Sequence, residues 1–478
     1  MKNFFISSAY VYPLCPLSLN HMKMFVIGDI IARNERKKGK NVIFPIAMHN
    51  SGNSAERISK LFTTLFSKDK KDYSDEEKRT FNLYKNNYDT PINVLKTFNH
   101  PLNILDYYSQ EILWEVKSLN ISCDFKHFYS TKDKDFTEFV NTIIALYKKN
   151  GLLVYNKKGD LALDYNNTNW KKKILKTIDR AEFIQSFHKK NIISAIQDVR
   201  NDWPILRKNG SGVVYNKKWI IDPMFDSEIL SIFDLYIRFR KNTKLGDIKS
   251  FFKRLFKKLK TKKKSNNILI NKITDSLPCD VFISEEHLKN WVVKKLYSET
   301  FLLDKKYQTK KYFILGMGFL DGKQMSASKG HAILAKDLIE KYGPIKTRLI
   351  ILLGGGHPSK MYEYDKSLPI YADKLLNGFI KHHKYLLNII NNKVSTKNAK
   401  KINIDIRLIQ NNIKENIEKG YYRQAVIELL SILPKKIQKS PTKRTAKRLI
   451  TIYKEYSDIL LPGLLNYNLN KTCRKTKF

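Results

Sequence analysis

The N-terminal end of the chain constrains the fold most strongly, because it alternates between strand-like and helix-like patterns. Residues 4–12 (FFISSAYVY) alternate bulky and small side chains as a strand does, and residues 21–38 carry apolar side chains at helical spacing up to Gly39. Residues 41–46 (NVIFPI) have the pattern of a second buried strand. This order predicts a βαβ unit of a parallel sheet, and therefore an α/β fold. Such sheets bind ligands at the carboxyl ends of their strands, so we expect a ligand against residues 10–21.

The rest of the chain divides into helical and strand-like stretches. Residues 53–150 are mostly helical in pattern and end at Gly151, and a second helical stretch covers 170–199 before DWPILRKNGSG (202–212) interrupts it. From residue 364 onward the pattern predicts amphipathic helices, and therefore a helical domain. The expected strands of a second α/β half are DVFISEEHL (280–288) and KKYFILGMGFL (310–320).

The charge balance indicates a polyanionic partner. Of the 478 residues, 88 are Lys or Arg and 45 are Asp or Glu, which gives a formal net charge of +43. A surplus of this size attracts nucleic acid, although an AT-rich genome also enriches Lys and Asn. The apolar share of 42% is enough for a folded core.

The cysteines and the N-terminus favour a cytoplasmic protein. Cys15, Cys123, Cys279 and Cys473 lie far apart and form no CxxC pair, so neither a disulfide framework nor a metal site is expected. Pro13 and Pro16 interrupt the apolar N-terminal run, which argues against a signal peptide. No apolar run approaches the ~20 residues of a membrane span.

One basic segment, KSFFKRLFKKLKTKKK (249–264), stands apart from the rest. Helical spacing places Phe252, Leu255, Phe256 and Leu259 on one face and lysines around the other. Three interpretations stay open at this point. The apolar face docks on the protein with the lysines in solvent, the lysines contact phosphates, or the helix lies on an anionic membrane.

A set of residues in the N-terminal stretch follows a fixed order: Tyr10, Tyr12, Pro13, Pro16, Asp29, Ala32, Arg33, Arg36, Gly39, Phe44, Pro45, His49, Ser51 and Gly52. This order resembles the ATP-binding region of class I aminoacyl-tRNA synthetases, most closely the archaeal and eukaryotic type of leucyl-tRNA synthetase. Further segments resemble that family in the same order along the chain. They are ISCDFKHFYST (121–131), LDYNNTNWKKK (163–173), WIIDPMFDSEI (219–229), GKQMSASKG (322–330) and YYRQAVIELLSI (421–432).

The resemblance implies a Rossmann-type parallel sheet with a helical connector and a C-terminal α-helical bundle. Residues 1–130 would form the first half of the catalytic domain, and 131–219 a short helical connector in place of the family's editing insertion. Residues 220–345 would form the second half, with a basic insert at 240–266, and 346–478 a helical anticodon-binding-like domain. Only a dozen residues separate Gly151 from Asp164, where the family inserts its editing domain, so proofreading is not expected. The family's C-terminal extension has no counterpart after the bundle, so we also expect weaker or different recognition of tRNA.

The motifs that contact ATP in the family are altered here. The HIGH tetrapeptide matches Ser18, Leu19, Asn20 and His21, and the KMSKS loop matches Gln324, Met325, Ser326, Ala327 and Ser328, with Lys323 and Lys329 on either side. The ribose-contacting segment matches residues 285–288, where Glu285 and His287 replace Gly and Asp. A carboxylate at Glu285 would repel a triphosphate. The resemblance implies that Ser18, Asn20, His21, Glu285, His287, Gln324 and Met325 bind ATP, and that His21, Ser326, Ser328, Lys323 and Lys329 act in catalysis.

Other interpretations of these residues stay open. His21 at a helix N-terminus either donates to phosphate or caps its own helix, and Ser326 and Ser328 are catalytic or ordinary loop hydroxyls. The positions that match the family's amino acid site are Tyr10, Tyr12, His49, Asp226 and Ser227. Tyr10 and Tyr12 alternatively belong to the core, and His49 to a loop. The fold prediction places His21 and Ser326 on one cleft.

The resemblance implies an ATP-dependent, leucyl-type aminoacyl-tRNA ligase without editing. It would use ATP with Mg²⁺ and bind tRNA and leucine or a similar amino acid, as a cytoplasmic monomer that does not bind membranes. Two alternatives remain. One is a weak or inactive synthetase-like protein that binds tRNA or another partner through its basic surface. The other is a ligase that passes an activated amino acid to an acceptor other than tRNA.

Overall fold

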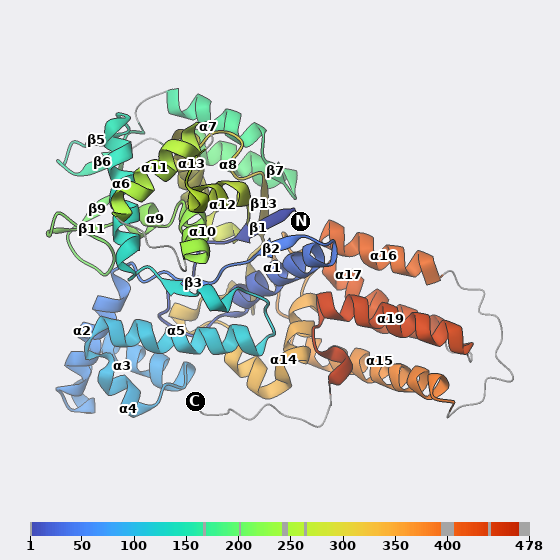
Figure 1. Cartoon of the computed structure of the whole chain (residues 1–478). Coiled ribbons are helices and arrows are strands. Elements are labelled where there is room, and N and C mark those ends of the chain that lie inside the picture. The colour runs from blue at the N-terminus through green and yellow to red at the C-terminus, as the bar shows by residue number, and fades with distance from the viewer. Residues whose placement is uncertain are drawn as a thin grey trace. The chain divides into compact units, whose positions relative to one another are not determined.

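The computed structural model describes residues 2–165, 169–199, 202–240, 247–261, 265–392, 406–437 and 441–467. The chain divides into two compact units, each built from separate segments (Figure 1). The first, here called the sheet unit, consists of Met1–Pro16, Gly39–Ile112 and Cys123–Ile314. The second, here called the helical unit, consists of Leu17–Lys38, Leu113–Ser122 and Leu315–Phe478. The four consecutive regions expected from the sequence do not map one to one onto these units, so their boundaries stay predictions.

A parallel sheet forms the centre of the sheet unit, in the order β2-β1-β12-β13-β7. Its strands are β1 (Asn3–Ser7), β2 (Asn41–Ile43), β7 (Glu182–Phe183), β12 (Cys279–Ser284) and β13 (Lys311–Leu315). The pairs β1–β2, β1–β12 and β7–β13 are all parallel. Phe5 lies opposite both Ile43 and Cys279, and all three are buried, as expected for strands covered on both faces. The predicted α/β fold with a parallel sheet is confirmed.

The first strand is shorter than the sequence pattern suggested. It ends at Ser7, whereas the alternation continues to Tyr12. Beyond Ser7 the Tyr10 hydroxyl donates a hydrogen bond to Asp234, and Val11 forms only an isolated bridge with Met48. These tertiary contacts, and not a strand, account for the alternating aromatic residues.

Two predicted strands of the second half also end early. β12 stops at Ser284, and Glu285–Val292 form irregular helical turns that lead into α13 (Val293–Leu302). The 310–320 stretch divides into β13 and β14 (Gly318–Leu320), which belongs to a different sheet. The break falls at Gly316, where a Cβ atom would lie 2.2 Å from the backbone carbonyl carbon of Lys360. Only glycine permits this close approach of two backbone segments.

The connector at 131–219 contains more strand than predicted. Its helices are α6 (Lys134–Lys149), α7 (Asn169–Asp179) and α8 (Ser186–Asp198). Between and after these helices lie strands of two or three residues, namely β5 (Leu153–Tyr155), β6 (Leu161–Leu163), β7, β8 (Trp203–Pro204), β9 (Leu206–Arg207), β10 (Val214–Tyr215) and β11 (Trp219–Ile221). Such strands are too short to show a period of two in the sequence. β7 also becomes the edge strand of the central sheet.

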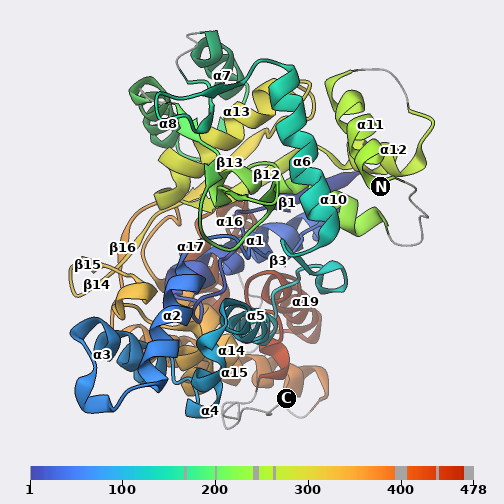
Figure 2. The ribbon, with the colours of Figure 1, turned by 90° about the vertical axis from the view of Figure 1, so that its left-hand side faces the viewer.

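The segments before and after the connector in the sequence are mainly helical. The 47–130 stretch contains, in chain order, β3 (Ala47–Met48), α2 (Ser54–Phe66), α3 (Asp75–Asn82), α4 (Ile92–Leu95), α5 (Pro101–Ser118) and β4 (Tyr129–Ser130). After β11 come α9 (Pro223–Asp226), α10 (Leu230–Arg240), α11 (Ile248–Lys260) and α12 (Ile268–Ser276). Figure 2 shows α6 and α11 side by side, and the two helices pack against each other. Residues 262–264 of the predicted basic segment lie outside the described residues.

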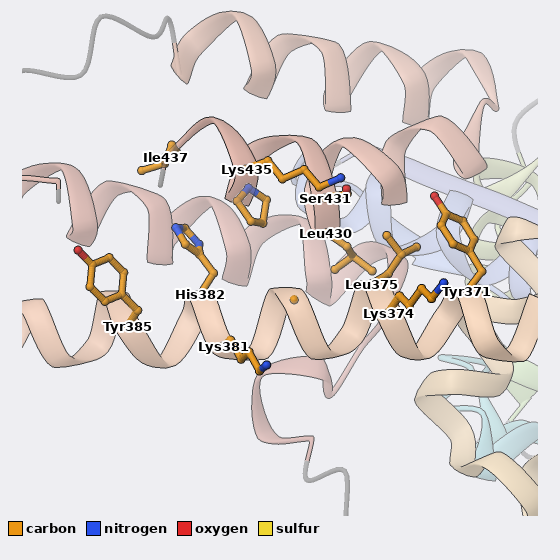
Figure 3. A pocket seen from close by; sticks show the side chains of 12 residues that line it. Tyr371, Lys374, Leu375, Lys381, His382, Tyr385, Leu430, Ser431, Lys435 and Ile437 are labelled. Carbon is orange, nitrogen blue, oxygen red and sulfur yellow. The ribbon is translucent and has the colours of Figure 1, made fainter. Parts of the chain in front are cut away.

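The helical unit begins with α1 (Leu19–Lys37), close to the helix predicted at 21–38. It continues with the small sheet of β14, β15 (Lys323–Gln324) and β16 (Tyr362–Glu363), and with α14 (Ala335–Leu353). The expected C-terminal helices follow as α15 (Leu368–Ile390), α16 (Ile406–Lys419), α17 (Tyr422–Ile427), α18 (Leu433–Lys436) and α19 (Lys443–Leu460). A pocket opens beside α15 (Figure 3). Among the described residues, no helix is long and apolar enough to cross a membrane.

Candidate active site

The N-terminus of α1 carries the residues that match the HIGH tetrapeptide. Ser18 is the N-cap residue, and its backbone N–H donates to Nδ1 of His21 at 3.4 Å. The Ser18 hydroxyl lies 3.2 Å from the same nitrogen. His21 is half-buried. Because its ring contacts both the backbone and the hydroxyl of Ser18, His21 takes part in capping its own helix, which is one of the two interpretations that the sequence left open.

The loop that matches KMSKS follows β14 as a compact turn. The Ser326 amide donates to the carbonyl of His331 at 2.7 Å, and the hydroxyls of Ser326 and Ser328 lie 3.3 Å apart. Met325 is buried, with 4% of its surface exposed, whereas Lys323, Gln324 and Lys329 are exposed. The loop therefore presents two lysines and a hydroxyl pair to solvent.

The two motifs meet within the helical unit. Asn20 Oδ1 accepts hydrogen bonds from the backbone N–H of Gly318 at 3.0 Å and from the Tyr362 hydroxyl at 3.1 Å. A Cβ atom on Gly318 would lie 2.5 Å from both Asn20 Oδ1 and the Met325 methyl carbon, so a larger residue here would displace these side chains. Ser18 also forms a bridge with Leu334, just beyond the loop. The structure thus brings the Ser18–Asn20 segment and Met325 together, although Met325 lies some three hundred residues further along the sequence.

Glu115 fixes both flanks of this arrangement, and sequence reasoning missed it. Its carboxylate is fully buried and accepts from the backbone N–H of Leu17 at 3.0 Å and of Lys336 at 3.2 Å. Leu17 precedes the first motif, and Lys336 lies in the first turn of the helix after the second motif. The sequence signal that could have identified Glu115 is its position among apolar residues, in the ILWEV stretch of α5. A carboxylate in such a buried position is rare unless it accepts hydrogen bonds.

Lys23 lies one turn into α1 and is also buried. Its Nζ is 3.4 Å from the carbonyl oxygen of Gly316 and 4.1 Å from the centre of the Tyr362 ring. Burial lowers the pKa of Lys23 to about 7. A charge-bearing group therefore stands close to the strands that carry the second motif.

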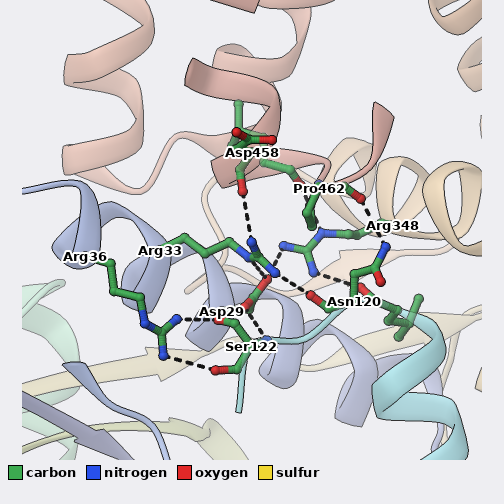
Figure 4. A network of polar contacts seen from close by, with 10 residues as sticks. Asp29, Arg33, Arg36, Asn120, Ser122, Arg348, Asp458 and Pro462 are labelled. Carbon is green, nitrogen blue, oxygen red and sulfur yellow. Dashed lines mark hydrogen bonds and ion pairs between the residues drawn. The ribbon is translucent and has the colours of Figure 1, made fainter. Parts of the chain in front are cut away.

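Asp29 lies near the middle of α1 and anchors this helix (Figure 4). Its carboxylate pairs with Arg348 at 2.6 Å and Arg33 at 2.8 Å and accepts from the Ser122 amide at 2.7 Å. Burial alone would raise the pKa of Asp29, but the two guanidinium groups and the Ser122 hydrogen bonds outweigh it and hold that pKa below its ordinary value. Arg33 also donates to the Asn120 carbonyl at 2.6 Å, so the network ties α1 to neighbouring segments of the helical unit.

Three residues of the predicted amino acid site come together in the sheet unit. His49 Nε2 lies 2.7 Å from Asp226 Oδ1, and both residues are buried. Ser227 donates to the Pro223 carbonyl at 2.8 Å and accepts from the Trp291 indole N–H at 3.2 Å. The second oxygen of Asp226 is buried and has no hydrogen-bond partner among the described residues.

Tyr10 and Tyr12 do not join that cluster through their hydroxyls. Tyr10 donates to Asp234, which also accepts from Tyr129 at 2.9 Å and from Ser7 at 3.1 Å. Burial raises the pKa of Asp234 to about 7 despite these three donors. The Tyr12 hydroxyl instead accepts from the Ala55 amide at 3.2 Å.

Glu285 and His287 occupy the turn after β12. Glu285 is partly exposed and lies 4.0 Å from the buried His188 ring, and burial raises its pKa. His287 lies 3.5 Å from Glu286, and burial lowers the pKa of His287. Among the described residues, no group of three or more His, Cys, Asp or Glu side chains is placed to hold a metal ion.

The C-terminal bundle carries a separate basic and aromatic pocket of about 700 Å³ (Figure 3). The lining side chains with polar or aromatic groups are Tyr371, Lys374, Lys381, His382, Tyr385, Ser431 and Lys435. His382 Nδ1 lies 2.8 Å from the Tyr453 hydroxyl, which fixes the orientation of its ring. Burial lowers the pKa of His382. Lysines around half-buried tyrosines are a combination that suits nucleic acid.

Comparison with known proteins finds relatives over part of the chain. A stretch of 153 residues is 29% identical to leucine–tRNA ligase 2 of Sulfolobus acidocaldarius and 31% identical to leucine–tRNA ligase of Archaeoglobus fulgidus. In each case the match covers 32% of this chain and 15% of the relative, so the chain spans about one seventh of the curated relatives it matches. No family model matches the sequence.

Solved structures match over nearly the whole chain. Mycobacterium tuberculosis methionyl-tRNA synthetase bound by methionyl-adenylate matches with TM-scores of 0.63 and 0.64 at 12% identity. The matches cover 96% and 97% of this chain and 92% of each synthetase.

Proposed function

We propose that the chain is an ATP-dependent aminoacyl-tRNA ligase of the leucyl type. The fold is that of a class I aminoacyl-tRNA synthetase, and part of the sequence resembles archaeal leucyl-tRNA synthetases, as the motifs indicated. The observation that carries the proposal is the meeting of the two altered ATP motifs at Asn20, Gly318 and Met325. Leucine is proposed from the partial sequence similarity.

The reaction is an attack of the amino acid carboxylate on the α-phosphate of ATP, which forms an aminoacyl-adenylate and releases pyrophosphate. No covalent intermediate with the enzyme forms, so catalysis consists of positioning and of charge stabilisation. The positive end of the α1 dipole, together with His21, would face phosphate. Lys323 and Lys329 would supply positive charge from the exposed loop. Mg²⁺ would arrive bound to the triphosphate, which is how proteins usually bind it at such sites.

The amino acid would bind at the His49–Asp226 pair. The unpartnered oxygen of Asp226 is a buried acceptor, which suits the α-ammonium group. Asn50 lies next to His49 in the chain, and both polar atoms of its buried side chain also lack a partner among the described residues. A polar ligand at this place would satisfy groups that are otherwise costly to bury. Tyr10, held by Asp234, would act as a wall of the site and not as a donor.

The proposed ligase has no proofreading activity against mischarged tRNA. The dozen residues between Gly151 and Asp164 form the β5–β6 hairpin, in which Leu153 pairs with Leu163. We therefore propose that discrimination between amino acids depends on the activation site alone, which limits it against substrates that differ by one methylene.

Pyrophosphate exchange with each of the twenty amino acids tests the proposal. A loss of ~1 kcal/mol at each of about five altered contacts would slow activation by roughly three to four orders of magnitude, so we expect weak, leucine-dependent exchange. His21→Ala and Lys329→Ala should lower it further, whereas Lys158→Ala, at an exposed turn of the sheet unit, should not. Because His21 caps α1, the thermal unfolding of His21→Ala is needed to separate a lost phosphate contact from a weakened helix.

Glu285→Gly provides the opposite test. If this carboxylate repels the triphosphate, its removal should raise the exchange rate. Exchange that is absent with every amino acid and is not restored by Glu285→Gly would contradict the enzymatic proposal.

The synthetase-like binder is the alternative, and the basic, aromatic pocket of the bundle favours it independently of catalysis. Charging of purified tRNA separates a tRNA ligase from a ligase with another acceptor. Retention of tRNA binding without exchange would support the binder. A cytoplasmic monomer remains the expectation for either function.

A further inference from the structure

The apolar face of α11 is buried inside the sheet unit. Phe251, Phe252, Leu255, Phe256 and Leu259 are each at most 2% exposed. The Phe252 ring lies 5.2 Å from that of Phe139 and 4.9 Å from that of Tyr236. The membrane interpretation of this basic segment is therefore wrong, because it needs the same apolar face at the lipid surface.

The exposed side of α11 borders a pocket of about 610 Å³ that it shares with α6. Leu146, Phe256 and Leu302 contribute apolar surface, and four lysines surround it, namely Lys149, Lys253, Lys257 and Lys260. No Asp or Glu belongs to the lining. Lys260 donates to the side-chain oxygen of Asn150 at 3.0 Å, while Lys149, Lys253 and Lys257 form no ion pair with the described residues.

The negative C-termini of the adjacent helices do not neutralise the positive charge of these lysines. α6 and α11 both end beside the pocket, and each helix C-terminus carries roughly half a negative charge. Two such ends offset about one of the four positive charges. Burial lowers the pKa of Lys260, and the positive charge of the neighbouring Lys149 lowers it further. This lowering agrees with several positive charges close together. The pocket is therefore a site with unbalanced positive charge.

The spacing of the lysines selects the kind of anion. Lys253 and Lys257 are one turn apart on α11, a rise of about 6 Å along the helix, and Lys260 continues the row. A ligand with charges repeated along its length would contact all of them, whereas a single phosphate would contact one or two. Nucleic acid strands combine such a backbone with planar bases that stack on apolar and aromatic surface.

We propose that the pocket between α6 and α11 binds a single-stranded segment of RNA, with phosphates at the lysines and a base against the apolar floor. Identifying this RNA as part of tRNA rests on the proposed function. The binding itself depends only on the sheet unit.

Salt titration of binding to a labelled leucine tRNA transcript tests the proposal. For single strands, each phosphate contact contributes a slope of about 0.7 in log affinity against log salt concentration. The double variant Lys253→Gln, Lys257→Gln should lower this slope by about 1.4. The control Lys157→Gln, Lys158→Gln removes the same charge from an exposed turn of the same unit and should leave the slope nearly unchanged. Equal changes in both variants would show that only diffuse charge matters and would overturn the proposal.

A second variant tests the apolar floor without changing any charge. Ala145 lines the pocket from the exposed side of α6, so Ala145→Phe would fill the space for a base. We expect RNA affinity to fall about tenfold or more, because base stacking contributes about 1–3 kcal/mol, with an unchanged melting temperature. Wild-type affinity in a folded Ala145→Phe protein would overturn the part of the proposal that places a base in the pocket.

Pyrophosphate exchange separates this inference from the proposed function, because that assay contains no RNA. If wild-type protein shows no exchange but the lysine variant lowers the salt slope, the pocket is an RNA site and the proposed amino acid activation fails. If wild-type protein shows exchange and the salt slope of the lysine variant equals that of wild type, the RNA-pocket proposal fails and the proposed function stands.

Discussion

Two buried aspartates, one in each unit, respond to burial in opposite ways. In the sheet unit, Asp234 accepts from the hydroxyls of Ser7, Tyr10 and Tyr129, and burial raises its pKa to about 7. In the helical unit, Asp29 is equally buried, yet Arg348 and Arg33 hold its pKa below the ordinary value.

The difference lies in the partners of each carboxylate. Neutral hydroxyl donors satisfy hydrogen bonds but do not repay the cost of taking a charge out of water, whereas two guanidinium groups do. Asp29 is therefore a structural anchor that depends on its charge. Asp234 is a hydrogen-bond acceptor that changes its protonation near neutral pH.

The largest expected effect comes from removing Arg348. Arg348→Met leaves Asp29 buried with only the partly exposed Arg33 as a charged partner, and breaking a buried pair in this way costs about 3–5 kcal/mol. Urea unfolding, with hydrogen exchange of peptides from α1 and α14, measures the loss. Arg33→Met is the matched control and should cost clearly less, since its side chain is 22% exposed. Equal costs would mean that Arg348 is not the main partner.

The pH dependence of stability should separate the two aspartates by sign. Asp234 has a raised pKa in the folded state, so its contribution is complete below the unfolded pKa near 4 and is lost as pH rises to about 7. Asp29 has a lowered pKa, so its contribution is present above pH 4 and is lost as pH falls below that value. Each pKa unit corresponds to about 1.36 kcal/mol.

Asn substitutions test this contrast directly. Asp234→Asn should flatten the decline of stability between pH 4 and 7, and Asp29→Asn should remove the loss of stability at acidic pH. Unfolding midpoints in urea across this pH range provide the measurement. The contrast between the two sites is refuted if both variants change the same part of the profile.

The smallest expected effect concerns the hydroxyls around Asp234. Tyr129→Phe removes one donor at 2.9 Å and should cost about 1 kcal/mol, as is typical of a single hydrogen bond. Because that bond lowers the pKa of Asp234, the stability midpoint assigned to Asp234 should move to higher pH. Tyr10→Phe should move it in the same direction. A shift to lower pH in either variant would show that the hydroxyls do not favour the charged carboxylate.

The sequence by itself determined the elements with a strong local signal. The βαβ order, α1 and the helical C-terminal part followed from periodicity that extends over whole elements, and the motif order identified the class I fold before any contact was known. The strands of two or three residues in the connector lack that signal and were missed.

Tertiary structure alone decided what the candidate site residues contact. Nothing local to Asn20 indicates that its side chain accepts from Gly318, or that Glu115 fixes the backbone of Leu17 and Lys336. The same holds for Tyr10, whose place in the sequence suggested a strand, while its hydroxyl is held by Asp234 from α10. The spacing of apolar residues in the sequence indicates which face of a helix or strand is buried. A hydrogen bond between distant segments instead depends on where the whole fold places both partners.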